Sequence, residues 1–296
     1  MRFDKTTELP KHWFWDGDNL SFNEEWLNHR PLSYSSLKLF RDSPRHYASR
    51  FIVGSKPPTP EMMFGKLAEA YIFESEQQFN KKFRLFEKAS GTGSKAVNAE
   101  FYAKATKDKV QLYTKEDLQR AKYCKMAVMD NDESRQLIEA RVDFQKRLKW
   151  HNKAANIPLI GYLDYRSTAW ESEWLVDFKT AGNADPVEFA KAAVNWDYHI
   201  QAAAYSDAFK RLYYRFPDFI FHVVETKEPY NVSINFVESS TMEKAKDEFY
   251  GSLLAFRKCI EDKAFHKGYE FRNFDNMDYF ALRMPGWYKP KYGGLR

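Results

Sequence analysis

An aspartate and a lysine interrupt the apolar stretch WLVDFKTAG, which covers residues 174–182. Side chains two positions apart on a strand point to the same face, so Asp177 and Lys179 would lie side by side. The opposite face would carry three apolar side chains, namely Trp174, Val176 and Phe178. A carboxylate can bind a metal ion, and an amine beside it can exchange a proton or stabilise an anion. The pattern therefore indicates a strand that could carry hydrolytic chemistry.

A second carboxylate, Asp164, stands thirteen residues before Asp177, at the end of the preceding predicted strand in GYLDYR. If the two strands are neighbours, both carboxylates can converge at one end of the sheet. Two close anions repel each other, and a bound divalent metal ion removes that repulsion. Oxygen ligands favour Mg²⁺ or Mn²⁺. Lys179 could then orient or deprotonate a water molecule and stabilise charge that develops on a phosphate.

The acid-x-lysine pattern occurs twice more, so the triplet is a weak signal when taken alone. Glu261 and Lys263 fall in a predicted helix, where residues two apart diverge and usually form a solvated face. Glu225 and Lys227 end a predicted strand, but no strand carboxylate precedes them at hairpin distance, which favours a salt bridge or a peripheral site. For the first triplet, a structural ion pair stays open as the alternative to a metal site.

Two predicted helices place polar side chains among apolar ones. Glu69 lies in MMFGKLAEAYIF, residues 62–73, and a carboxylate buried there is costly unless it is paired or binds a metal ion. Lys66, three positions earlier, is the alternative partner. Gln201 and Tyr205 in HIQAAAYSDAF are four positions apart, so they would share one helical face. Tyrosine at such spacing usually packs in a core, whereas the glutamine is harder to explain by packing.

The elements that must position these residues alternate between strands and helices. Three successive strands are expected at 142–150, 159–167 and 173–180, as an antiparallel meander. A later strand pair should turn at residues 228–230. Helices are expected over five stretches of the chain. The first begins at Ser33 or Ser35 and ends before Pro44, and the third is a capped run from Thr114 and Asp117 to about 140 with a break at 130–132. The other three cover 61–74, 185–214 and 241–265.

This order predicts one α/β domain over residues 31–296, with a central mixed β-sheet flanked by helices. Residues 1–30 show no clear period and are expected to form an N-terminal arm or an irregular cap. The small polar segment ASGTGSKAVN, residues 89–98, is expected to be a flexible loop.

Composition excludes several classes of protein. The two cysteines, Cys124 and Cys259, are far apart, which argues against a disulfide scaffold, a zinc ribbon and an iron–sulfur cluster. No stretch has the GxxxxGK[ST] spacing of a phosphate loop, so ATP hydrolysis is not expected. No run approaches the roughly 18 apolar residues of a membrane span, and we expect a cytoplasmic protein. A net charge of +5 permits a polyanionic partner, and 17% aromatic residues fit base stacking or an aromatic core.

Taken together, these segments resemble the PD-(D/E)XK nuclease superfamily and, within it, the RecB-like branch that includes RecE (exonuclease VIII) and the lambda-type phage recombination exonucleases. The resemblance runs from about Leu32 to Trp287 and looks closest to RecE. Five segments carry it: LSYSSLKLFRDSPRHY, FGKLAEAYIFESEQQF, GYLD, VDFKT and the pair Gln201-x-x-x-Tyr205. The resemblance implies a restriction-endonuclease-like core.

The resemblance also implies roles for single residues. Mg²⁺, for which Mn²⁺ could substitute, would be bound by Glu69, Asp164, Asp177 and the backbone carbonyl of Phe178. Lys179 would serve the nucleophilic water, and Gln201 and Tyr205 would support the site and the DNA backbone. RecE relatives usually carry histidine where this chain has Glu69, whereas lambda-type exonucleases are similar to this chain in using glutamate.

The activity implied by the resemblance is digestion of linear double-stranded DNA from 5′ ends, leaving 3′ strands for a single-strand annealing partner in a bacterial or phage-infected cell. Family members close into ring-shaped homo-oligomers around DNA. Candidates for gripping a 5′-phosphate are Ser35, Ser36, Arg41 and Arg45, although a solvated helix face is an alternative for either arginine. Two other functions stay open, an endonuclease of the same superfamily and a non-catalytic DNA-binding protein on the same fold.

Overall fold

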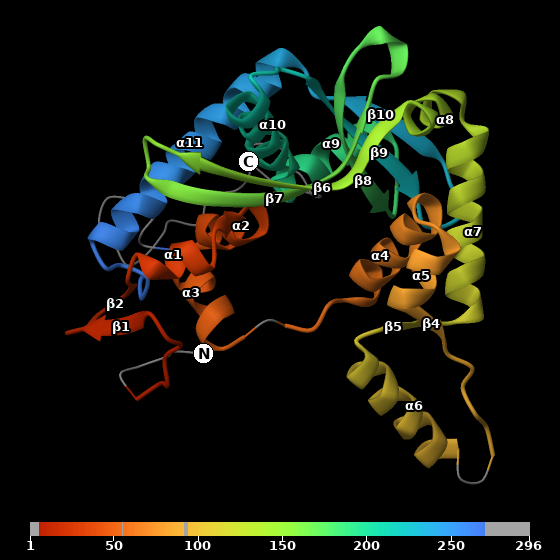
Figure 1. Cartoon of the computed structure of the whole chain (residues 1–296), viewed down its shortest axis with the longest axis horizontal. Helices are drawn as coiled ribbons and strands as arrows, with labels where there is room; N and C mark the ends of the chain where they lie inside the picture. The colour runs from red at the N-terminus through yellow and green to blue at the C-terminus, as the bar shows by residue number, and fades with distance from the viewer. Residues whose placement is uncertain (1–5, 55, 92–93, 270–296) are drawn as a thin grey trace, which may run out of the picture.

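The structure, a computed structural model, describes residues 6–54, 56–91 and 94–269. A mixed sheet of six strands lies at its centre (Figure 1), in the order β10-β9-β8-β7-β3, with β6 also paired to β7. The strands are β3 (Leu32–Ser33), β6 (Arg141–Asn152), β7 (Ile157–Ser167), β8 (Trp174–Ala181), β9 (Asp218–Glu225) and β10 (Val232–Phe236). Strands β6, β7 and β8 pair antiparallel, whereas β8 with β9 and β3 with β7 pair parallel.

Helices cover both faces of this sheet. The larger ones are α2 (Tyr34–Asp42), α3 (Pro44–Ile52), α4 (Pro60–Phe73), α7 (Lys115–Asp130), α8 (Asp132–Glu139), α9 (Pro186–Asn195), α10 (Tyr198–Tyr213) and α11 (Ser239–Glu261). On one face, Leu175 and Phe221 pack in a core that α10 and α11 share. On the other face, Val176 and Phe178 pack with α4, α7 and α8. The predicted α/β class with a flanked mixed sheet is confirmed.

The ends of the elements follow the capping signals in the sequence. Ser33 is the N-cap of α2, where its hydroxyl accepts a hydrogen bond from the amide of Ser36. Thr114 and Asp117 form the predicted capping box at the start of α7. Asp185 accepts hydrogen bonds from two amides in the first turn of α9. The meander, the later strand pair β9–β10 and the break between α7 and α8 also agree with the expected positions.

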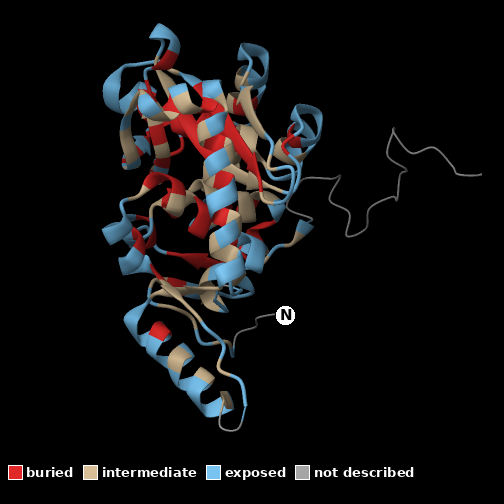
Figure 2. Ribbon diagram, turned by 90° about the vertical axis from the view of Figure 1, so that its right-hand side faces the viewer, coloured by how far each residue is buried: buried red, intermediate tan, exposed pale blue. Residues whose placement is uncertain are grey.

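Two stretches are more regular than the sequence predicts. An arm or an irregular cap is expected for residues 1–30, whereas the described part contains the hairpin β1 (Trp13–Asp16) and β2 (Asn19–Phe22) followed by α1 (Glu25–His29). Elements this short show no period, and buried aromatic side chains such as Trp13 and Trp26 hold them on the core. Helix α6 (Ser94–Asp108) begins inside the segment expected to be a loop and projects from the body with most residues exposed (Figure 2).

Strands β7 and β8 separate part of the way along their length. Their pairing ends at Tyr165 and Val176, so the next residues in register, Asp164 and Asp177, lie where the strands part. From there β7 pairs with β6 and β3, while β8 stays paired with β9 as far as Ala181. The separation leaves backbone groups of both strands to be satisfied by side chains.

Two further expectations concern the whole chain. In the part that the structure describes, none of the helices combines the length and the apolar character needed to cross a bilayer. The predicted domain reaches residue 296 and the resemblance reaches Trp287, and the positions beyond residue 269 lie outside the described residues.

The packing of Tyr205 against β7 predicts that Gly161 cannot gain a side chain. A Cβ at Gly161 would lie 2.5 Å from a ring carbon of the buried Tyr205. We expect Gly161→Ala to lower the free energy of unfolding by about 1–3 kcal/mol, because the ring has no free space into which to move. Urea unfolding followed by circular dichroism measures this change.

The matched control is Gly251→Ala in α11, where a Cβ would meet nothing within 4 Å. This substitution should leave the protein as stable as before or stabilise it by up to about 1 kcal/mol, since alanine is the better helix former. Equal destabilisation by both variants would contradict the close contact at Gly161.

Candidate active site

Two carboxylates lie where β7 and β8 separate. Asp164 is the first residue beyond the paired part of β7, and Asp177 is its counterpart on β8. The amide of Phe178 donates a 2.8 Å hydrogen bond to Oδ2 of Asp164, so a carboxylate stands where a strand partner would otherwise be. Asp177 is buried, with 1% of its surface exposed, and Asp164 is half-buried. The structure therefore brings both carboxylates to one end of the β7–β8 pair.

Lys179 and Gln201 hold the buried carboxylate of Asp177. Its Oδ2 forms an ion pair with the ammonium of Lys179, and its Oδ1 accepts a 2.7 Å hydrogen bond from the amide nitrogen of Gln201. The amide oxygen of Gln201 accepts a 3.1 Å bond from Lys179. The ammonium also lies 4.7 Å from the centre of the Tyr198 ring, within the range of a cation–π contact. These contacts fix the Lys179 amine beside the carboxylates.

Tyr205 connects α10 to the parted strand β7. Its hydroxyl donates a 2.9 Å hydrogen bond to the backbone carbonyl of Tyr162 and lies 3.5 Å from the amide nitrogen of Gln201. Its ring packs against Gly161, which is why the GYLD segment carries a glycine at that position. Gln201 and Tyr205 are both buried and share one face of α10, so the structure places both beside Asp177.

Helix α4 brings a third carboxylate, Glu69, to the same place. Its Oε1 accepts a 2.5 Å hydrogen bond from the side-chain nitrogen of Gln145, which lies 3.4 Å from Oδ1 of Asp164. Gln145 therefore bridges the two carboxylates. Lys66, the alternative partner of Glu69, is exposed, and no ion pair between them occurs among the described residues.

Burial and mutual repulsion raise the pKa of the acidic groups. Burial, reinforced by the charge of Asp177, raises the pKa of Glu69 to about 7, although the hydrogen bond from Gln145 lowers it. Burial and the charges of Asp177 and Glu69 raise the pKa of Asp164 well above its usual value. Burial lowers the pKa of Lys179, but the charges of Asp177 and Asp164 outweigh burial and the net pKa is raised. The site thus raises the pKa values of its acids through burial and repulsion, and it raises that of Lys179 through attraction.

This donor set fits a divalent cation. The three carboxylates lie close to a single ammonium group, that of Lys179. Hard oxygen donors such as these carboxylates are the ligands that Mg²⁺ and Mn²⁺ prefer. Within the described residues their ligand atoms do not all lie within 4.8 Å of one another, since Gln145 and Lys179 stand between them. A cation at Asp164 and Asp177 would relieve the repulsion that raises the pKa values.

The four residues predicted to grip a 5′-phosphate have internal partners. Arg41 pairs with Asp197 and Glu248, and Arg45 donates a 2.7 Å bond to the carbonyl of His266. The hydroxyls of Ser35 and Ser36 both contact the N-cap Ser33. Ser35 is exposed, whereas the two arginines are half-buried, so the solvated face that was the alternative for the arginines is not what the structure shows.

Several side chains of the site carry no signal in the sequence. Gln145 lies opposite Asp164 in the β6–β7 register and has a left-handed backbone with φ of 50°, which nothing in VDFQKRLKW predicts. Lys38 of α2 donates a 3.0 Å hydrogen bond to the carbonyl of Trp196, and its ammonium lies 4.5 Å from the centre of that indole ring. Burial lowers the pKa of Lys38, the charges of Asp197 and Asp42 act against burial, and the charge of Lys179 acts with it.

The other acid-x-lysine triplets serve the fold. Glu225 is buried, and its two carboxylate oxygens accept hydrogen bonds of 3.1 Å from the amide of Ala184 and 3.0 Å from the amide of Asn231. Lys263 pairs with Asp16 of the N-terminal hairpin.

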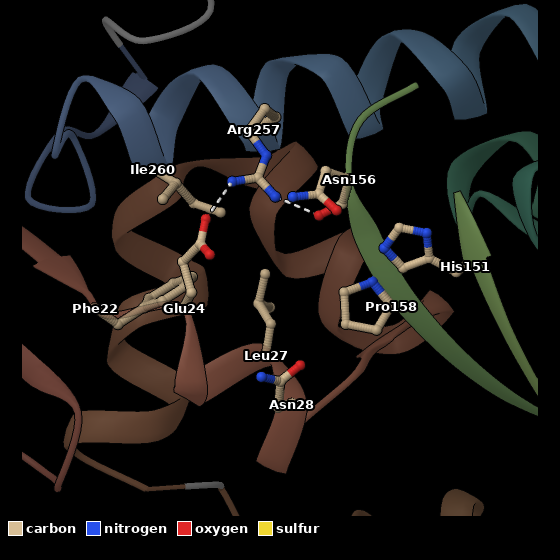
Figure 3. A pocket seen from close by; sticks show the side chains of 9 residues that line it. All are labelled: Phe22, Glu24, Leu27, Asn28, His151, Asn156, Pro158, Arg257 and Ile260. Atoms are coloured by element: carbon tan, nitrogen blue, oxygen red, sulfur yellow. Dashed lines mark hydrogen bonds and ion pairs between the residues drawn. The ribbon is translucent and has the colours of Figure 1, made fainter. Parts of the chain in front are cut away.

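A pocket of about 120 Å³ lies elsewhere, between α1, the turn from β6 to β7, and α11 (Figure 3). It is smaller than the roughly 300–1,000 Å³ of a typical ligand site. Arg257 closes one side by an ion pair with Glu24 and a hydrogen bond to the carbonyl of Asn156 (Figure 3). Pro158 at this pocket precedes Asp164 by six residues of β7, a separation of about 20 Å along a strand. The pocket is therefore distinct from the carboxylate site.

Comparison with known proteins supports the same fold. A family model described as "PDDEXK-like domain of unknown function (DUF3799)" matches residues 33–268. The fold is similar to a crystal structure of a protein from Eubacterium rectale described as a "Putative exonuclease", with 12% sequence identity and a TM-score of 0.54. That match covers 80% of this chain and 85% of that chain, and at such low identity it shows the fold alone. No curated protein matches the sequence.

The raised pKa of Glu69 predicts that this carboxylate destabilises the metal-free protein at alkaline pH. In the unfolded chain its pKa is about 4.3, whereas in the folded chain it is about 7. The folded state therefore binds the proton more tightly, and stability falls as the pH rises through this interval. We expect Glu69→Gln to raise the free energy of unfolding at pH 8 by about 1–3 kcal/mol, and the gain to shrink as the pH falls to 4.5.

Urea unfolding in the presence of EDTA at both pH values measures this difference. Glu243→Gln on the exposed face of α11 is the control and should change stability at neither pH by more than about 0.5 kcal/mol. A Glu69→Gln variant that is less stable than the unmodified chain at pH 8 would show that Glu69 is favourably paired.

Proposed function

This chain belongs to the family of PDDEXK-like domains designated DUF3799, and on that premise we propose that it is a metal-dependent, ATP-independent exodeoxyribonuclease acting on linear double-stranded DNA. One observation carries the proposal: Asp164, Asp177 and Lys179 meet where β7 parts from β8, with Glu69 bridged to them by Gln145. A binding protein that only needed a stable sheet would gain nothing from three repelling carboxylates at this point.

The residues that would hold divalent ions are Glu69, Asp164, Asp177 and the backbone carbonyl of Phe178. Such an ion supplies positive charge to phosphate oxygens and lowers the pKa of water. We propose Mg²⁺, for which Mn²⁺ could substitute, because every proposed donor is an oxygen atom.

Lys179 would act on the phosphate and on the attacking water as a charged hydrogen-bond donor. Asp177 and Asp164 raise its pKa, so the amine is an ammonium in this geometry and can stabilise negative charge on the phosphate. The amide of Gln201 joins Lys179 to Asp177 and keeps both in place. Tyr205 in turn anchors the helix of Gln201 to β7 through the carbonyl of Tyr162.

Contacts to the DNA would come from α2 and the segment before α10. Lys38 is a second ammonium beside the site, suited to a phosphate of the backbone. Trp196, whose surface is 56% exposed, offers a ring on which a base can stack. Ser35 is exposed and remains a candidate for a terminal phosphate, whereas Arg41 and Arg45 would first have to leave their internal partners.

The direction of digestion and the biological role rest on the resemblance to RecE and the lambda-type exonucleases. We propose digestion from 5′ to 3′ that leaves single strands for recombination by annealing, by a ring-shaped homo-oligomer with a single-strand annealing partner. The direction and role of digestion are independent of the chemistry of the site. Metal-dependent hydrolysis at the carboxylates would therefore stand even if the direction or the role were wrong.

The central experiment digests a linear duplex labelled separately at its 5′ and 3′ termini, with and without Mg²⁺. We expect the 5′ label to be released first and only with Mg²⁺. Lys179→Ala should slow hydrolysis by about 10²–10⁴-fold, because the charge that stabilises the phosphate is lost, while DNA affinity changes little. Circular dichroism confirms that the variant is folded.

Lys66→Ala is the matched control, since Lys66 is an exposed lysine of α4 on the helix that carries Glu69. It should digest DNA at the rate of the unmodified chain. Hydrolysis that survives EDTA or Lys179→Ala would contradict the proposed site. Cleavage of a covalently closed plasmid would identify an endonuclease, and DNA binding without any hydrolysis would identify a non-catalytic protein on this fold.

A further inference from the structure

Three side chains with metal-binding atoms meet at the N-terminal hairpin. One ligand atom from each of His12, Glu25 and His29 lies within 4.8 Å of the other two, a combination that no other three such residues achieve in the described chain. Nδ1 of His12 is 3.2 Å from Oε2 of Glu25, and the two imidazole rings are 5.1 Å apart at their centres. This cluster contains nitrogen donors, unlike the carboxylates at β7 and β8.

The cluster is separate from the proposed nuclease site. Helix α1, which carries Glu25 and His29, borders the pocket at Pro158 of β7 (Figure 3). Asp164 lies six residues further along that strand, which is about 20 Å. A cation held at the cluster would therefore touch none of the residues proposed to act on DNA.

The backbone of the cluster is fixed by packing that does not involve the three ligands. Trp13, next to His12, and Trp26, next to Glu25, are both buried, with their rings in edge contact 5.6 Å apart at the centres. The amide of Asn23 donates a 2.8 Å hydrogen bond to the carbonyl of His12, which closes the hairpin. Glu25 and His29 are four positions apart on α1, so their side chains lie on the same side of the helix.

His12 adopts a backbone conformation that suits this role. Its φ of 83° lies in the left-handed region, which residues other than glycine rarely adopt. Its side chain is only 8% exposed and pairs with Glu25, whose side chain is 70% exposed. The strained residue thus aims its imidazole at α1, and strain of this kind is held by the structure around it and is often found at functional positions.

We propose that His12, Glu25 and His29 form a site for a transition-metal cation of the Zn²⁺ type. Two imidazoles and one carboxylate are a common zinc donor set, with water in the remaining position. Ligand atoms at about 2.0–2.1 Å from a tetrahedral zinc ion are about 3.3 Å apart, close to the 3.2 Å between His12 and Glu25. Rotation of the exposed His29 side chain supplies the remaining approach. The ion would link the residue before β1 to α1 and so stabilise the packing of the N-terminal hairpin against this helix.

The two sites differ in the metal that they select. Imidazole nitrogen suits Zn²⁺ and its neighbours, whereas carboxylate and carbonyl oxygens suit Mg²⁺ and Mn²⁺. Millimolar Mg²⁺ should therefore occupy the nuclease site and leave the cluster free for Zn²⁺. This difference allows the cluster to be titrated alone in the full chain.

The test is a calorimetric titration of the full chain, without an affinity tag, with Zn²⁺ in the presence of excess Mg²⁺. We expect one equivalent of Zn²⁺ to bind. At a hundredfold excess over the dissociation constant, the midpoint of thermal unfolding should rise by about 5 °C. Replacement of Zn²⁺ by Co²⁺ should give the visible absorption bands of a tetrahedral site.

His29→Ala is the decisive variant, because His29 is exposed at the end of α1 and its loss leaves the core intact. It should weaken Zn²⁺ binding at least tenfold and so reduce the thermal shift to about half or less, while Mg²⁺-dependent digestion of DNA is unchanged. His12→Ala should lose binding in the same way. The control His151→Ala removes an exposed histidine of β6 and should bind like the unmodified chain. Unchanged Zn²⁺ affinity in His29→Ala, or no uptake by the unmodified chain, would overturn the proposal.

Discussion

The amide of Phe178 donates to a carboxylate instead of to a neighbouring strand, and the rest of the site depends on that substitution. Because a buried backbone N–H must have a partner, β8 can part from β7 only if a side chain takes over. Asp164 does so, and the separation makes room for Glu69 from α4 and for Tyr205 from α10. The same arrangement brings like charges together, which raises the pKa values of the acids. A cation among them would stabilise the ionised carboxylates. Lys179 supplies part of this positive charge through its ion pair with Asp177.

Beneath the charged residues lies a neutral polar layer. His222 of β9 is fully buried, and its two ring nitrogens lie 2.8 Å from the hydroxyls of Ser134 and Tyr165. Burial lowers the pKa of His222 to about 3, so the ring stays uncharged. Its ring packs edge-on against Phe178 at 5.1 Å between centres. The carboxylates therefore lie next to an uncharged polar layer, and among the described residues Lys179 is the cation that pairs with Asp177.

Much of the fold could be predicted from the sequence because its signals are local. Alternation in WLVDFKTAG separates the two faces of β8, and capping residues such as Ser33 and Asp185 mark where helices begin. The N-terminal hairpin could not be predicted, since strands of four residues show no period and their aromatic side chains pack against Phe265, which is distant in sequence.

Some residues of the site could likewise be predicted from local patterns in the sequence, whereas others could not. Asp177 and Lys179 can be recognised in the sequence because they are charged residues in an apolar strand. Glu69 can be recognised because it is a charged residue in an apolar helix. Gln145 does not, because its role depends on an unusual backbone angle within β6 and on the register with β7. Arg41 is attractive as a phosphate ligand in sequence, yet its partners Asp197 and Glu248 come from segments more than 150 residues away. Long-range pairing decides which charges are available, and no local pattern records it.

The most direct test of the central claim is the position of Mn²⁺ in crystals of this chain, measured by its anomalous scattering. The account predicts an anomalous peak bound by the carboxylates of Asp164 and Asp177 and the carbonyl of Phe178, with the Lys179 ammonium beside it and outside its coordination shell. A map in which Mn²⁺ avoids these oxygens, while Lys179 and Asp177 keep their ion pair undisturbed, would contradict the account and leave the carboxylates as part of the fold alone.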